Sequence, residues 1–178
     1  MSLPLLPPRL YPGDSIAVIY PAGPVRNQKR LESGLQILRG LNLRVRHYYP
    51  DNSGPDYLAA NDEQRVWNFH QLWNDETVKA LIAARGGYGC LRIIGKMDSS
   101  LLRSQPKWLI GFSDLTVLLN GIFATTGLVT LHGPMVTTLA HADSLSLQRF
   151  KEVLTNQFQP LARTKDLEIL RSVSGGKW

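Results

Sequence analysis

The sequence predicts an α/β fold, with a mainly parallel sheet flanked by helices. Short apolar runs rich in β-formers alternate along the chain with segments in which apolar residues recur every three or four positions, the pattern of strands alternating with helices. One run, VKALIAA at residues 78–84, is apolar almost throughout, as expected for a parallel strand covered on both faces. With 178 residues, 43% of them hydrophobic, the chain is long enough for one well-cored domain.

The N-terminal part predicts two further strands and two helices. Residues 15–20 are apolar and β-rich and end at a proline-rich loop, residues 21–24, so they form the first strand. Leucines spaced by three and four residues predict a helix over residues 28–41. A strand is expected at residues 43–49, and Asn61 opens a second helix with an apolar face.

After the strand at 78–84, the alternation continues to the last predicted helix. A short helical piece runs to Met97, and residues 108–110 form an apolar strand. Asp114 begins a helix-like apolar stretch, residues 128–131 give another strand, and residues 144–154 give a helix. No internal repeat or low-complexity segment interrupts this order.

Four loops are expected to meet at one edge of this sheet. In parallel sheets, ligands bind beyond the carboxyl ends of the strands. The loops that follow predicted strands are residues 21–24, 85–89, 113–114 and 132–134. The candidate site is therefore assembled from these loops.

Ser113 stands between a predicted strand and a predicted helix. A serine at such a turn can expose its hydroxyl above the sheet, with the next backbone N–H free to bind an oxyanion, which makes Ser113 a candidate nucleophile. Serine is also a preferred helix N-cap. The hydrolase pattern G-x-S-x-G is incomplete, because Leu115 occupies the position of the second glycine. From this stretch alone, both interpretations stay open.

The glycine-rich segment RGGYG, residues 85–89, has two interpretations as well. Its glycines permit positive φ angles and close approach, so its N–H groups could bind an anion, or it could be a tight turn between strand and helix. It matches neither a dinucleotide fingerprint, since Arg92 stands in place of the third glycine, nor a P-loop. Arg85 is a candidate for binding a substrate carboxylate or a surface charge at a strand end.

Three other side chains could take part in chemistry. His132 follows a predicted strand and is the local candidate for a base acting on Ser113, or it hydrogen-bonds within its own loop. Asp114 could orient a histidine, or serve as the favoured negative charge in the first turn of a helix. Cys90 would be a nucleophile only if its pKa were lowered, and buried packing is its other interpretation.

Composition narrows the classes of partner and location. The net charge of +6 comes from Lys and Arg residues spread along the chain without a basic run, so we expect no nucleic-acid partner. No apolar run reaches the roughly 20 residues that span a bilayer, and the N-terminus lacks the features of a secretory signal, so a cytoplasmic protein without a membrane partner is expected. The single cysteine excludes an intrachain disulfide and a Cys-based metal site, and neither a metal nor a cofactor is expected.

Five segments, in this order, resemble the N-terminal half of the LD-carboxypeptidase family, cytoplasmic serine peptidases that include the microcin C immunity hydrolases. The matching segments are PGDSIAVIYPAGP at 12–24, YLAANDEQR at 57–65, KALIAARGGYGCLRII at 79–94, PKWLIGFSDLTVLL at 106–119 and GLVTLHGPM at 127–135. The resemblance implies a flavodoxin-like sheet, similar to the N-terminal domain of class I glutamine amidotransferases. It also implies metal-independent hydrolysis of the amide to a terminal D-amino acid, with release of D-alanine from murein tetrapeptide.

The resemblance also assigns roles to residues. Ser113 is then the nucleophile, and the backbone N–H groups of Gly87 and Asp114 are the oxyanion donors. The residues that this resemblance places around the small peptide substrate are Arg85, Pro21, Ala22, Gly23 and His132.

One departure from the family is important. Its catalytic glutamate and histidine belong to a second, C-terminal domain, to which no residue of this chain corresponds. Residues 1–160 are therefore expected to form the nucleophile-bearing domain and residues 161–178 the start of a linker, with the chain inactive alone. Apolar surface left for the second domain makes a homodimer an expected assembly. The alternatives are an immunity hydrolase for a peptidyl-nucleotide antibiotic and a non-catalytic anion-binding module.

Overall fold

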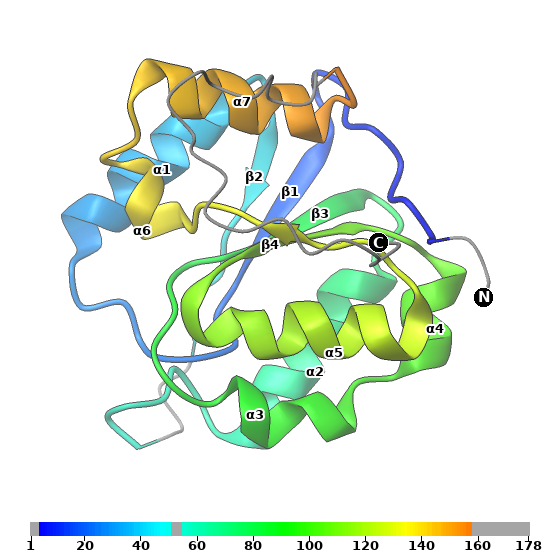
Figure 1. Cartoon of the computed structure of the whole chain (residues 1–178). Helices are drawn as coiled ribbons and strands as arrows, with labels where there is room; N and C mark the ends of the chain where they lie inside the picture. Colours follow the sequence, from blue (N-terminus) through cyan, green and yellow to red (C-terminus); the bar gives the residue numbers. More distant parts are fainter. Residues whose placement is uncertain (1–3, 51–54, 158–178) are drawn as a thin grey trace, which may run out of the picture.

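A five-stranded, all-parallel sheet forms the centre of the protein, as the computed structural model shows for residues 4–50 and 55–157 (Figure 1). The strand order is β2-β1-β3-β4-β5. The strands are β1 (Ser15–Ile19), β2 (Arg44–Arg46), β3 (Val78–Ala83), β4 (Trp108–Gly111) and β5 (Leu131–His132). The predicted α/β fold is confirmed, since helices flank the sheet on both sides.

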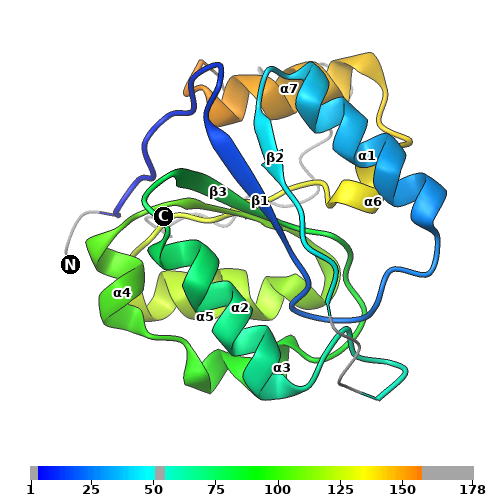
Figure 2. The ribbon, with the colours of Figure 1, turned by 180° about the vertical axis from the view of Figure 1, so that it is seen from behind.

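The helices are divided between the two faces of the sheet (Figures 1 and 2). One face is covered by α1 (Gln28–Gly40), α6 (Val136–Leu139) and α7 (Ser144–Leu154). The other face is covered by α2 (Asp62–Asn74), α3 (Cys90–Ile93), α4 (Ser99–Ser104) and α5 (Thr116–Thr126). Two short 3-10 turns, η1 (Ile94–Lys96) and η2 (Ser113–Leu115), precede α4 and α5.

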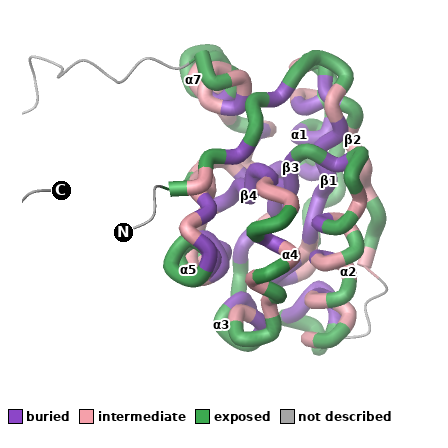
Figure 3. Tube along the Cα trace, turned by 90° about the vertical axis from the view of Figure 1, so that its right-hand side faces the viewer, coloured by how far each residue is buried: buried purple, intermediate pink, exposed green. Residues whose placement is uncertain are grey.

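Two apolar cores result from the alternation of side chains along the strands. In β1, Ile16 and Val18 pack against the layer of α1 and α7, whereas Ala17 and Ile19 pack against the layer of α2 and α5. All five residues of β1 are buried, and Figure 3 shows this buried interior between exposed outer helix faces. Burial on both faces explains why the central strands are almost continuously apolar.

The predicted bounds are accurate for the longer elements. The helices α1 and α2 begin after Asn27 and Asn61, whose side chains accept hydrogen bonds from N–H groups of the first turn. Two strands are shorter than expected: β2 is an edge strand of three residues, and Leu128 forms only an isolated bridge to Leu5 before β5 begins. The short helices α4 and α6 were not predicted, because six and four residues are too few to show a helical period.

The described residues, 4–50 and 55–157, form helices of at most 13 residues. None of their helices is long and apolar enough to cross a membrane. The expected boundary at residue 160, together with the linker expected at 161–178, lies outside the described residues.

Lys107, just before β4, gives the protein a predicted pH dependence. The residue is 5% exposed, and its ammonium group donates a hydrogen bond of 2.6 Å to the carbonyl oxygen of Asp75. Burial lowers the pKa of Lys107 from 10.5 to about 8. The unfolded chain therefore binds the proton of Lys107 more tightly than the folded protein does. The free energy of unfolding should rise by roughly 2–3 kcal/mol between about pH 8 and about pH 10.5. Below about pH 8, burial of the charged ammonium group destabilises the folded protein by this full amount. Urea unfolding at several pH values across this interval measures the rise, which Lys107→Met should lack. The prediction would be contradicted if the free energy of unfolding changed with pH in the same way in both proteins.

Candidate active site

A hollow opens beyond the carboxyl ends of the central strands, where the chain order reverses. The strand order β2-β1-β3 sends the connections after β1 and β3 in opposite directions, and such switch points are where α/β sheets bind ligands. The hollow has a volume of about 390 Å³. We call it the Ser113 hollow; its lining residues are Val25, Arg26, Asn27, Arg30, Arg85, Gly86, Gly87, Phe112, Ser113, Met135 and Thr137.

Ser113 lies at a strained turn between β4 and α5. Its φ angle is 60°, and the other described non-glycine residues with positive φ are both asparagines, which tolerate this conformation better. Its side chain is exposed and makes no capping hydrogen bond, so the structure does not support the helix-cap interpretation. A non-glycine residue in this region costs about 1–3 kcal/mol, and such strain is concentrated at functional sites.

Leu115 explains why the second glycine of the hydrolase pattern is absent. Its side chain folds back under the turn, fully buried, and a Cβ atom on Gly111 would lie 2.3 Å from its Cδ2 atom. The close approach that needs a glycine therefore occurs before Ser113. The turn from β4 into η2 is thus formed by Gly111-Phe112-Ser113-Asp114-Leu115, with its glycine before the serine and not after it.

The glycine-rich loop after β3 lies directly against Ser113. A Cβ atom on Gly86 would stand 3.0 Å from both Cβ and Oγ of Ser113. Gly87 has a φ angle of 131° and leaves no room beside Gly23, whose N–H donates a hydrogen bond of 3.2 Å to the carbonyl oxygen of Gly86. The glycines at these positions thus allow backbone, rather than side chains, to face the serine.

Asp114 is engaged in holding the loops together. Its carboxylate accepts a hydrogen bond of 2.9 Å from the N–H of Cys90, at the start of α3, so it is not placed to orient a histidine. Cys90 is fully buried, and burial, reinforced by the charge of Asp114, raises the pKa of its thiol. The structure therefore favours the packing interpretation of Cys90.

Three arginines make the Ser113 hollow cationic. Arg85 donates a hydrogen bond of 2.9 Å to the carbonyl oxygen of Pro24 and so fixes the loop after β1. Arg26 and Arg30, in and after that loop, are exposed and line the same hollow. No carboxylate is among the described residues that line it, so the arrangement favours an anionic group close to Ser113.

Other predicted site residues do not line the Ser113 hollow. His132 is exposed, packs against the ring of Phe112 with centroids 6.2 Å apart, and lines a separate hollow. Within the described part of the chain, no hydrogen bond joins it to Ser113. Pro21, Ala22 and Gly23 are buried, and the first two contribute backbone carbonyl groups to hydrogen bonds. The residues of this connection that line the hollow are Val25, Arg26 and Asn27.

The described residues contain no group of three or more His, Cys, Asp or Glu side chains placed to hold a metal ion. His70, which the sequence predicts to be packed or solvated, accepts a hydrogen bond of 3.2 Å from the N–H of Asp98 and contacts the ring of Phe69. This histidine therefore has a structural partner.

A parallel α/β domain that presents a serine at a strained strand-to-helix turn has the architecture of a nucleophile elbow. Residues 16–133 match the LD-carboxypeptidase N-terminal domain of the S66 peptidases. The chain belongs to this family, which confirms the resemblance found in the sequence.

Relatives and solved structures agree with this assignment. The chain is 36% identical to a probable murein peptide carboxypeptidase of Bacillus subtilis over 99% of its own length and 55% of the relative's. The muramoyltetrapeptide carboxypeptidase of Oxalobacter formigenes has a similar structure, with a TM-score of 0.70 and 30% identity over 79% of this chain and 48% of the other. The microcin self-immunity protein MccF, solved with glutamyl sulfamoyl guanosine, gives a TM-score of 0.80 at 25% identity, over 85% of this chain and 47% of MccF. The chain thus spans about half the length of the curated relatives it matches.

Sequence reasoning missed some residues of this site. Arg26 and Arg30 belong to the Ser113 hollow because α1 starts at its rim, and nothing in their spacing singles them out. Arg65 is buried beneath the loops, and its only sequence signal was its place in the segment YLAANDEQR.

Proposed function

We propose that this chain is the nucleophile-bearing half of a serine-type LD-carboxypeptidase that cleaves the amide to the terminal D-alanine of murein tetrapeptide. The observation that carries the proposal is the exposed, strained Ser113 with the backbone of Gly86 against it. Family membership supports the reaction class, and the relatives' names support the murein peptide. One solved MccF structure is an active-site mutant in which a serine is among the residues replaced by alanine.

In this proposal, Ser113 Oγ attacks the amide carbonyl carbon, and the carbonyl oxygen becomes an oxyanion. The N–H groups of Gly87 and Asp114 donate hydrogen bonds to that oxygen. Gly87 follows Gly86, whose carbonyl oxygen accepts a hydrogen bond from the N–H of Gly23, and Asp114 is itself held by the hydrogen bond from the N–H of Cys90 to its carboxylate. Donors fixed in this way stabilise the charge where it develops, and each contributes about 3–4 kcal/mol in well-studied cases.

The arginines of the Ser113 hollow provide a site for the terminal carboxylate. Arg26 and Arg30 are exposed and line the hollow, and Arg85 lines it as well while it donates a hydrogen bond to Pro24. The N-terminus of α1, a helix of 13 residues capped by Asn27, adds the positive end of its dipole. A substrate that ends in a carboxylate is thereby directed with its last amide toward Ser113.

We assign the general base to the C-terminal half found in the relatives, because no hydrogen bond joins His132 to Ser113 within the described residues and the His132 ring packs on Phe112 instead. A serine hydroxyl without a base is a weak nucleophile near neutral pH, so the chain alone should be inactive or nearly so. Residues 1–160 would then act as the nucleophile domain and residues 161–178 as the beginning of the connection.

The test is D-alanine release from murein tetrapeptide by this chain alone and by this chain joined to the C-terminal half of the Bacillus subtilis relative. The joined protein should release D-alanine, and the chain alone should be slower by at least about 10³-fold, since the base is absent. A tetrapeptide ending in L-alanine is the control and should not be cleaved. Equal rates for the chain alone and the joined protein would disprove the assignment of the base.

A second substrate class follows from the similarity to MccF. Structures of that protein hold glutamyl sulfamoyl guanosine and aspartyl sulfamoyl adenosine. Competition between such a conjugate and murein tetrapeptide for the joined protein distinguishes the two. Exclusive turnover of the conjugate would replace the murein assignment while leaving Ser113 as the nucleophile.

A further inference from the structure

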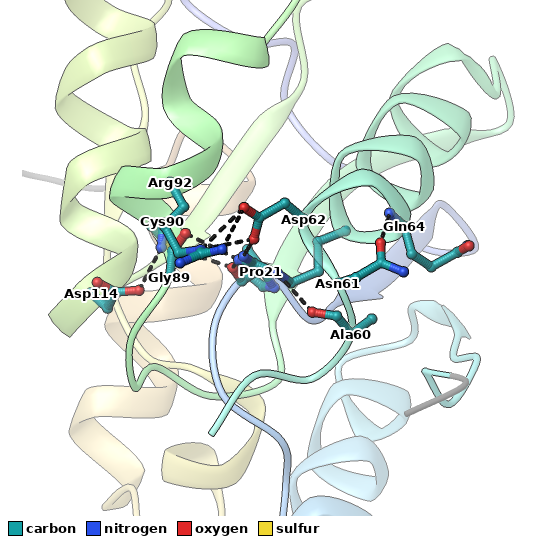
Figure 4. Close-up of polar contacts among 10 residues, drawn as sticks. Pro21, Ala60, Asn61, Asp62, Gln64, Gly89, Cys90, Arg92 and Asp114 are labelled. Carbon is teal, nitrogen blue, oxygen red and sulfur yellow. Dashed lines mark hydrogen bonds and ion pairs between the residues drawn. The ribbon is translucent and has the colours of Figure 1, made fainter. Parts of the chain in front are cut away.

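Arg65 is a buried cation that lies beneath the active-site loops. It belongs to the second turn of α2, and only 2% of the residue is exposed. Its guanidinium group donates to three backbone carbonyl groups: Nε to Ala60 at 3.2 Å, and Nη1 to Gly89 at 3.1 Å and also to Pro21. Figure 4 shows these carbonyl groups gathered around one point, from three separate segments of the chain.

A carboxylate and a second arginine complete this cluster. Asp62, in the first turn of α2, pairs with Nη2 of Arg65 at 2.5 Å and with Arg92 of α3 at 3.0 Å. The two arginines hold the pKa of Asp62 below its usual value. The buried guanidinium is therefore neutralised and hydrogen-bonded, as a buried charge must be.

Two of the three carbonyl groups that Arg65 joins, those of Pro21 and Gly89, come from the loops after β1 and β3. Pro21 begins the loop after β1, which reaches Gly23; Gly89 ends the glycine-rich loop after β3. The next residue, Cys90, donates its N–H to Asp114, the neighbour of Ser113. Hydrogen bonds and the short backbone segments between them thus connect Arg65 with Asp114 and with Gly86, on two sides of the serine. Figure 4 shows the part of this connection that runs from Pro21 and Gly89 through Cys90 to Asp114.

We propose that Arg65 is a positioning residue: its guanidinium group sets the separation of the Pro21–Gly23 and Gly86–Gly89 loops at which the N–H of Gly87 can bind an oxyanion on Ser113. This inference rests on the proposed function for the reaction and on the hydrogen bonds above for the geometry. A donor to an oxyanion must be fixed before the reaction to be effective, and a loop rich in glycine has little rigidity of its own.

Only arginine fits this role. Its planar group offers five donors in fixed directions, whereas a lysine ammonium is a point charge that cannot reach three separated carbonyl groups in the same way. Gly89 packs closely on the guanidinium group, because a Cβ atom there would lie 2.8 Å from Nη1 of Arg65 and 2.6 Å from Cδ2 of Leu58. Gly89→Ala should therefore displace the same group, and it also places a side chain at a φ angle of 126°, which strains this loop.

The experiment compares this chain with its Arg65→Lys, Arg65→Met and Gly89→Ala variants by two measurements. Amide hydrogen exchange, resolved by peptide, reports on residues 20–24 and 86–90 against β3 and β4. Labelling of Ser113 by a fluorophosphonate at alkaline pH, where hydroxide ion serves as the base, reports the rate at saturating reagent and the half-saturating concentration. Arg39→Lys, on the exposed pair with Glu32, is the matched control.

All three variants should exchange at least about tenfold faster in the two loops, with β3 and β4 changed only in proportion to global stability. The saturating labelling rate should fall at least about tenfold with the half-saturating concentration unchanged, since a lost oxyanion donor acts on the transition state. Arg65→Lys behaving like Arg39→Lys in both measurements, or uniform acceleration of exchange in every segment, would overturn the proposal. Absence of label on Ser113 in every protein would instead count against the proposed nucleophile, and exchange in the loops would then decide the role of Arg65.

Discussion

Ser113→Ala is expected to lower D-alanine release by the joined protein by at least about 10³-fold, because loss of a nucleophile leaves only binding and the oxyanion donors. The folded structure should persist, since Ser113 is exposed and its hydroxyl makes no hydrogen bond within the described residues. The assay is steady-state release of D-alanine, accompanied by a test for label on residue 113 by mass spectrometry. Ser33→Ala, at an exposed position of α1, is the matched control and should retain full activity.

The same position allows an independent test through stability. Ser113→Gly should be as inactive as Ser113→Ala but more stable than the wild type by about 1 kcal/mol, because glycine adopts a φ angle of 60° without strain. Urea unfolding measures this gain. Full activity in Ser113→Ala would contradict the role of the serine. Ligand binding that survives Ser113→Ala, with no D-alanine release and no label on Ser113 in any protein, would favour the remaining alternative, a non-catalytic anion-binding module.

The sequence predicts the sheet well because its information is local. Each buried parallel strand is a short apolar run. In α1 and α2, an asparagine cap precedes a segment in which apolar residues recur with the helical period. The lengths of the edge strands are less predictable. β2 and β5 each pair with a neighbour on one side only, so their lengths depend on long-range contacts and not on the local sequence. That is why the strand expected at 43–49 is confined to Arg44–Arg46.

The candidate site could be predicted in part. The rule that loops meet at the carboxyl ends of parallel strands brings Ser113 and the glycine-rich loop together, as the distance from Gly86 shows. The same rule does not tell which neighbours a side chain takes. His132 ends β5 but packs on Phe112, and Arg65 comes from near the start of α2 yet contacts two of these loops.

Gly34 marks the closest packing between helices in the described structure for which a glycine is needed. It is buried in α1, and a Cβ atom there would lie 1.9 Å from the carbonyl oxygen of Val136 in α6. The obstacle is backbone, so no side-chain rotation can relieve it. Thr137 also holds α6 in place, through hydrogen bonds of 3.1 Å and 3.0 Å from its N–H and hydroxyl to the carbonyl oxygen of Ala84.

Gly34→Ala is therefore expected to lower the free energy of unfolding by about 3 kcal/mol, since overpacking outweighs the gain of up to about 1 kcal/mol in helix propensity. It should also alter the Ser113 hollow, because Met135 and Thr137 beside Val136 line it. Gly40→Ala, at the end of the same helix with nothing within 4 Å of the added Cβ atom, is the matched control and should be neutral or slightly stabilising. Urea unfolding of the two variants checks the prediction, and equal midpoints would show that α1 and α6 do not approach each other so closely.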